Sequence, residues 1–148
     1  MPKGLKIALT IVISCYCFSF GLWAAKGWSI YSRHQSLKQE ISVLNDLSSQ
    51  QKQTLDNLME SMKSDSRFDS VRKHLLAVKQ LTPTYTLDNA LMSIEENKKL
   101  HAFNENMVFG LMPFMDSKEG SVSLTEFQTL NYKIKAQQEK VKQYLFIE

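Results

Sequence analysis

The chain has 148 residues, of which 43% are hydrophobic, 22% charged and 10% aromatic. Its five glycines and three prolines exclude a collagen-like or low-complexity chain and argue against a turn-rich β protein. Lys3, Lys6 and Lys26 account for the whole net charge of +3, because residues 27–148 carry equal numbers of basic and acidic side chains. A clustered basic surface is typical of nucleic-acid-binding proteins, so we expect no nucleic-acid partner.

Residues 7–25 form an uncharged, mainly apolar run between two lysines. A helix of that length extends about 28 Å, close to the hydrocarbon thickness of a bilayer, and the run is longer than the apolar core of most cleaved signal peptides. Trp23, Trp28 and Tyr31 stand at its trailing edge, where amphipathic aromatics prefer the headgroup region. We therefore predict a short N-terminal tail over residues 1–6 and a retained transmembrane signal anchor over residues 7–25.

The positive charges on the two sides of this run are nearly balanced. Lys3, Lys6 and the amino terminus precede it, and Lys26, Arg33 and Lys38 follow it. A short tail before a signal anchor favours a cytoplasmic N-terminus. In a bacterium this orientation would give a single-pass protein of the inner membrane with its C-terminal domain in the periplasm.

An alternative use of the same run is lipidation. The sequence VISC at residues 12–15 resembles a bacterial lipobox, in which the cysteine, here Cys15, is lipidated after cleavage. Lipidation of Cys15 would make the chain a small lipoprotein, for which an exclusion or inhibitory role is the alternative function. Residues 16–25 remain apolar, however, whereas lipoproteins usually become polar soon after the modified cysteine.

Small residues recur within the predicted membrane segment. Cys17, Gly21 and Ala25 are spaced by four residues, which places them on one side of a helix. Such a stripe allows another transmembrane helix to approach closely, so we predict a membrane-packing face here. The alternative is chance, because small residues are common in transmembrane helices.

After the apolar run, residues 26–64 predict a juxtamembrane helical stalk that continues the membrane helix without a break. Hydrophobic residues follow a 4-3 spacing that is typical of a coiled-coil-like seam, with two polar positions that would set its register. The seam consists of Leu37, Ile41, Leu44, Ser48, Gln51, Leu55, Leu58 and Met62. It would either associate with a second copy of the chain or pack as an amphipathic helix within one domain.

Residues 65–148 predict a helical distal domain. An apolar stripe begins near Asp65 or Ser66 and ends before Pro83, and Thr86 is a candidate N-cap for a third helix. This third helix is expected to direct one apolar face inward and to extend toward residue 111. The face contains Leu87, Leu91 and Ile94.

The last helix is predicted to begin at a capping box formed by Ser123 and Glu126, with Val122 and Phe127 as the accompanying hydrophobic staple. No alternating run is long enough to predict a strand. The expected fold is therefore all-α, with a single N-terminal transmembrane helix continuing into a coiled-coil-like stalk and a small helical bundle.

Charged residues are distributed unevenly among the predicted distal helices. The last helix contains lysines at positions 133, 135, 140 and 142, offset locally by Glu139, whereas the third contains Asp88, Glu95 and Glu96, which Lys98 and Lys99 oppose. Such helices either neutralise one another within one bundle or offer a basic docking surface to an acidic partner.

The sequence contains little that resembles a chemical site. Residues 115–127 resemble a degenerate EF-hand loop, but Met115 replaces the oxygen ligand at its first position. His34, His74 and His101 are widely spaced and match no metal motif. There is also no nucleophile elbow and no glycine-rich phosphate loop. We expect no catalytic residue, no metal site, no cofactor and no enzyme activity.

These features favour a membrane-anchored, non-catalytic assembly or accessory subunit of a cell-envelope complex that acts through helical protein–protein contacts. Its expected partners are the lipid bilayer, other membrane or envelope proteins, and a second copy of the chain as a homo-oligomer. A membrane-tethered helical ligand sensor and the lipoprotein are the alternatives. A buried pocket with converging polar groups would favour the sensor.

Overall fold

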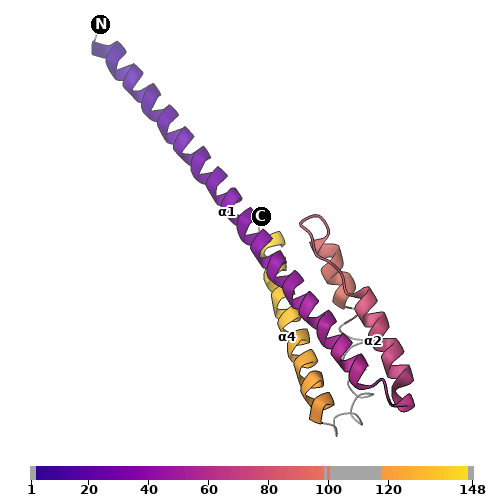
Figure 1. The fold of residues 1–148 in the computed structure, drawn as a ribbon. Helices are drawn as coiled ribbons and strands as arrows, with labels where there is room; N and C mark the ends of the chain where they lie inside the picture. Colours follow the sequence, from indigo (N-terminus) through magenta and orange to yellow (C-terminus); the bar gives the residue numbers. More distant parts are fainter. Residues whose placement is uncertain (1–2, 99, 101–117, 147–148) are drawn as a thin grey trace. The chain divides into compact units, whose positions relative to one another are not determined.

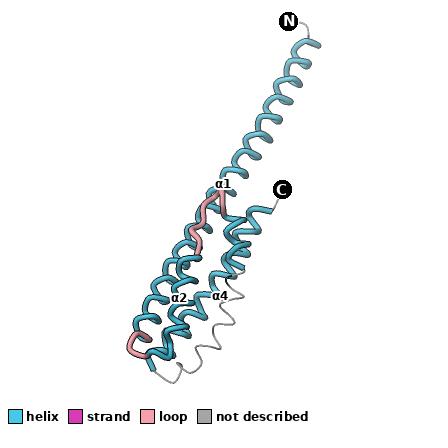
Figure 2. The backbone as a smooth tube through the Cα atoms, turned by 90° about the vertical axis from the view of Figure 1, so that its right-hand side faces the viewer, coloured by secondary structure: helices cyan, strands magenta, loops and turns pink. Residues whose placement is uncertain are grey.

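The computed structural model describes the backbone of residues 3–98, 100 and 118–146, which are helical apart from short connections (Figures 1 and 2). None of these residues lies in a strand, which confirms the prediction of an all-α chain. The chain divides into two compact units, Met1–Ser36 and Leu37–Glu148. The first unit consists of the N-terminal part of one long helix, and the second contains all the other helices.

That long helix, α1, runs from Lys3 to Ser61. No proline occurs between Pro2 and Pro83, so every backbone amide in this stretch is able to donate to the carbonyl four residues before it. The apolar run and the amphipathic segment after it therefore form one unbroken helix, as predicted.

A short turn after α1 leads into the 3₁₀ helix η1, Ser66–Phe68, and then into α2, Asp69–Leu81. The Asp65 carboxylate caps this start by accepting a 3.0 Å hydrogen bond from the backbone amide of Arg67. The predicted start near residue 65 and the predicted end before Pro83 are both confirmed.

Residues 90–98 form the third helical segment, which a reciprocal cap precedes. The Thr86 amide donates to the Asn89 side-chain oxygen at 2.7 Å, and the Asn89 amide donates to the Thr86 hydroxyl at 3.3 Å. Thr86 is therefore the cap that the sequence predicted. The buried face of this segment differs from the predicted one, because Ala90 is buried whereas Leu91 is 40% exposed. The predicted extension over residues 101–111 lies outside the described residues.

The last helix, α4, covers Lys118–Phe146, so the predicted start at a Ser123 capping box is wrong. Ser123 lies inside the helix, and Val122 is 64% exposed while Phe127 is fully buried, so the two form no staple. Gly120 lies inside α4, although Gly costs about 1 kcal/mol relative to Ala in a helix interior. Because the helix already includes the residues before Ser123, the backbone amides that a capping box would satisfy have carbonyl partners one turn earlier.

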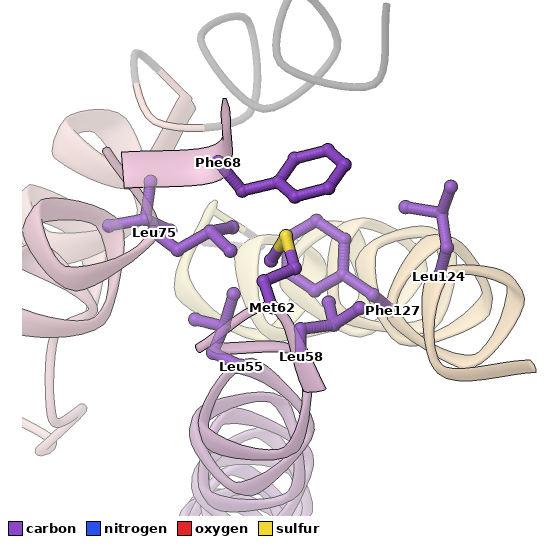
Figure 3. Packing of buried hydrophobic residues seen from close by; sticks show 8 residues of the cluster. Leu55, Leu58, Met62, Phe68, Leu75, Leu124 and Phe127 are labelled. Atoms are coloured by element: carbon purple, nitrogen blue, oxygen red, sulfur yellow. The ribbon is translucent and has the colours of Figure 1, made fainter. Parts of the chain in front are cut away.

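Within Leu37–Glu148, the helices alternate in direction around two clusters of buried side chains (Figures 1 and 2). The first, the turn cluster, lies near the turn that follows α1 and combines residues of α1, η1, α2 and α4 (Figure 3). Its members are Leu55, Leu58, Met62, Phe68, Leu75, Val78, Leu124 and Phe127. The second, the Tyr85 cluster, contains Ile41, Leu44, Tyr85, Ala90, Ile94, Ile134 and Val141.

The predicted seam of α1 supplies residues to both clusters. From Ile41 to Met62 every seam residue is buried, and Leu37 is partly buried against the Tyr85 cluster. The seam therefore packs within its own chain, which is the second of the two arrangements that the sequence left open. The compact unit Leu37–Glu148 accordingly begins at the first residue of this seam.

Candidate functional site

The N-terminal part of α1 carries a continuous apolar surface that no other described residue covers. Residues 10–32 are all exposed, among them large side chains such as Phe20, which is 77% exposed, and Trp23, which is 80% exposed. Within the described residues, α1 is the one helix that is long and apolar enough to cross a membrane, judged by length and composition. A solvent-exposed apolar surface of this extent is unusual for a soluble protein and is typical of a surface that contacts lipid or protein.

The candidate membrane-packing face lies on this surface. Cys17, Gly21 and Ala25 are exposed on α1, and a Cβ atom added at Gly21 would meet nothing within 4 Å. Cys15 and Cys17 are free thiols, both exposed. The face is therefore accessible to another helix, and its occupation remains a prediction.

Two aromatic side chains mark the end of the apolar surface. The rings of Trp28 and Tyr31 lie 6.1 Å apart between centroids, with a tilt of 38°. One helical turn separates them, so α1 holds them on neighbouring positions of one side. This arrangement suits the headgroup region of a bilayer, where amphipathic rings are enriched.

The interior of the second unit contains polar groups centred on the Tyr85 hydroxyl. Asn97 donates a hydrogen bond to this oxygen from its side-chain amide, and Gln138 donates another at 3.0 Å. All three side chains are buried. The phenol thus joins the segment after α2 to the third helical segment and to α4.

Burial raises the pKa of Tyr85, and the hydrogen bonds from Gln138 and Asn97 oppose this effect only in part. The Ser48 hydroxyl is near enough to lower the pKa of the phenol slightly, but it makes no hydrogen bond of regular geometry. The phenol is therefore neutral at physiological pH and serves as a hydrogen-bonding group rather than as a base.

A second contact fixes the backbone of Tyr85. The Asn45 side-chain amide donates to the Tyr85 carbonyl at 2.8 Å, and its oxygen accepts from the Tyr85 amide at 2.9 Å. One side chain on α1 thereby satisfies both backbone groups of a connecting residue that has no helical partners for them.

Further polar contacts join α1 to α4. Gln51, a seam residue, donates to the side-chain oxygen of Asn131. Gln137 donates to the Glu40 carbonyl at 3.0 Å and also to the Glu40 carboxylate. These contacts fix the register of α1 against α4. Of the two polar seam positions, Gln51 takes part in them, whereas the Ser48 hydroxyl makes no regular hydrogen bond.

Sequence reasoning missed Asn45, Tyr85, Asn97 and Gln138 as members of the network around the Tyr85 hydroxyl and backbone. A signal for Gln138 was present, because residues 137 and 138 are polar positions among the apolar residues of the last helix. We name the group formed by Ser48, Tyr85, Asn97 and Gln138 the polar layer.

Ion pairs connect oppositely charged helices within the bundle. Lys142 of α4 contacts Glu95 at 2.8 Å and Glu139 at 3.5 Å, and Lys79 of α2 contacts Asp56 of α1 at 2.6 Å. Hydrogen bonding from Lys142, and then from Lys98, lowers the pKa of Glu95. Lys142 of α4 and Glu95 of the third segment thus neutralise one another within the chain.

The described residues offer little to a metal ion. They contain no group of three or more His, Cys, Asp or Glu side chains that would hold one. His74 contacts the backbone oxygen of Ser70 through Nδ1 at 2.6 Å, and His34 is exposed on α1. His101 and residues 115–117 lie outside the described part, and residues 118–126 are helical, which is incompatible with an EF-hand loop there.

Comparisons with protein families, with curated proteins and with solved structures gave no significant match for this chain.

Proposed function

We propose that this protein is a membrane-anchored, non-catalytic assembly or accessory subunit of a cell-envelope complex. The observation that carries the proposal is the uncovered apolar surface of α1, joined through an unbroken helix to a unit with its own packed core. An apolar helix of this length satisfies its own backbone groups in lipid, so it is suited to anchoring. The helical unit would then be held near the membrane, where its outer surface contacts other proteins.

In this proposal the protein crosses the bacterial inner membrane once, with Lys3 and Lys6 in the cytoplasm and the bundle in the periplasm. Protease added to spheroplasts should then digest residues beyond Gly27 and spare the membrane segment. Digestion only after lysis would reject this orientation. A mass increase at Cys15, with loss of residues 1–14, would instead establish the lipoprotein alternative.

Homo-oligomerisation is part of the proposal, but the α1 seam is already occupied by α2 and α4. A second copy would therefore use exposed residues such as Cys17, Gly21 and Ala25. Replacing Gly21 by Ile should weaken a dimer in mild detergent, whereas Ile at Gly27, outside the stripe, should not. If the wild type and both variants dimerise equally, or if the wild type is monomeric, this face does not mediate self-association.

Protein partners are best sought through exposed apolar positions of the bundle, because single substitutions there leave the core intact. Met92 on the third segment, Val122 and Tyr132 on α4 are each more than half exposed. A photo-crosslinking side chain at each position, in native membranes, should trap a second protein from at least one of them. The same three proteins without irradiation are the control and should trap none. Absence of any adduct at all three positions would contradict the assembly role.

The ligand-sensor alternative has one observation in its favour, an open hollow of about 410 Å³ lined by Glu40, Lys140, Gln143 and Tyr144. Ligand sites usually enclose most of the ligand within mainly apolar walls, which this hollow does not. The buried polar groups around Tyr85 also bond to one another rather than to an open cavity. Isolation of the protein from native membranes in mild detergent discriminates between the two functions. A stoichiometric multiprotein complex would favour the accessory subunit, whereas a ligand-bound dimer without other proteins would favour the ligand sensor.

A further inference from the structure

A groove runs along one side of α1 at the end of its apolar run. Its volume is about 480 Å³, and it is lined by Ser19, Leu22, Trp23, Lys26, Gly27 and Ile30. These positions share one face because they are spaced by three or four residues. Gly27 contributes no side chain, and a Cβ atom there would meet nothing within 4 Å, so the groove is open beside it.

The groove combines apolar walls with one positive charge. Leu22, Trp23 and Ile30 supply the apolar walls, and Lys26 supplies the ammonium group. The chain has no acidic residue before Glu40, so the first unit contains no carboxylate that would neutralise Lys26. Any anion that neutralises it must come from another part of the chain or from another molecule.

An anionic phospholipid has the chemistry that this groove requires. Its phosphate would meet the Lys26 ammonium, and its acyl chain would lie against Leu22 and Trp23 on the membrane side of the lysine. Long basic side chains at the end of an apolar helix direct their charge toward the headgroups while their stems remain in apolar surroundings. A second parallel copy on the same face is less suitable, because it would bring two Lys26 side chains together.

We propose that the groove over Gly27 binds an anionic phospholipid, with the phosphate on Lys26 and an acyl chain along Leu22 and Trp23. This inference rests on the proposed membrane anchoring of α1. It adds a preference for anionic lipids to that anchoring, because a helix surface without the Lys26 charge would bind zwitterionic and anionic lipids equally.

The test uses the tryptophans of the chain, Trp23 and Trp28, as reporters of the lipids beside them. The full-length Trp28→Phe protein, which retains Trp23 in the groove, is reconstituted into mixed phosphatidylcholine–phosphatidylglycerol vesicles. Either phosphatidylcholine or phosphatidylglycerol carries brominated acyl chains, which quench a nearby indole. We expect phosphatidylglycerol to be enriched about fivefold beside Trp23, the factor that corresponds to about 1 kcal/mol for one basic side chain near an anionic surface.

Variants separate the groove from general charge attraction. Lys26→Gln should abolish the preference, whereas Lys38→Gln, the same change on the same helix twelve residues further along, should preserve it. Gly27→Leu, which fills the groove and retains the charge, should also reduce the preference. If Lys38→Gln abolishes the preference for phosphatidylglycerol as Lys26→Gln does, the preference arises from general charge attraction rather than from a defined site. That result would overturn the proposal.

The remaining outcomes distinguish the lipid site from the anchor. Equal quenching by both brominated lipids would overturn the lipid site while leaving membrane insertion intact. No quenching by either lipid would place Trp23 away from the bilayer and overturn both the lipid site and the proposed anchoring.

Discussion

Removal of the Tyr85 hydroxyl is the most direct test of the polar layer. Tyr85→Phe keeps the ring in its apolar cluster and deletes one oxygen, which accepts hydrogen bonds from Asn97 and Gln138. Those two side chains are only 4% and 2% exposed, so water cannot readily replace the lost acceptor. The substitution therefore leaves two buried donors without a partner.

The magnitude follows from the number of donors that lose their acceptor. Each buried group left unsatisfied costs about 1–3 kcal/mol, so Tyr85→Phe should lower the free energy of unfolding by about 2–4 kcal/mol after some relaxation of the two amides. Urea unfolding of the full chain in mild detergent, followed by far-UV circular dichroism, should show a midpoint lower by about 1–2 M. Tyr132→Phe, at a tyrosine that is 76% exposed, is the matched control and should change stability by less than about 0.5 kcal/mol.

A double-mutant cycle attributes the loss to the hydrogen bond rather than to packing. Asn97→Ala removes one of the stranded donors, so its effect in the Tyr85→Phe background should be smaller than in the wild type by about 1 kcal/mol. Ser48→Ala, which removes a buried hydroxyl without a regular hydrogen bond, should change stability by less than about 1 kcal/mol. Strictly additive effects, together with a Tyr85→Phe loss below about 0.5 kcal/mol, would refute the reasoning.

Leu58→Ala should destabilise the bundle by about 2–5 kcal/mol, measured by the same urea unfolding, because it opens a cavity in the fully buried turn cluster. Asn45→Ala should cost about 1.5–3 kcal/mol and abolish the hydrogen-exchange protection of the Tyr85 amide, since both backbone bonds of that residue are lost; unchanged protection would contradict this. The Glu95 carboxylate, whose pKa Lys142 holds below the ordinary value of 4.5, stabilises the fold above its unfolded pKa and loses this effect as pH falls through its folded pKa. Glu95→Gln should therefore lower the thermal midpoint at neutral pH, and the difference from the wild type should shrink as pH falls below 4.5 toward the folded pKa of Glu95. A pH-independent difference would exclude this ion pair as the cause.

The local patterns of the sequence determined which segments are helical and where several of them begin or end. The apolar run and the 4-3 spacing predicted the long α1, Pro83 predicted the end of α2, and Thr86 predicted the cap before the third segment. These predictions succeeded because hydrophobic periodicity, proline geometry and side-chain capping act within a few residues of the chain.

Tertiary structure alone decided what the seam faces. The seam residues are buried against α2, the third segment and α4, which a periodicity of 3.5 residues does not distinguish from burial against a second copy. Asn45 meets Tyr85 across 40 residues of sequence, and Gln138 meets it across 53. Such contacts depend on which helix faces come together.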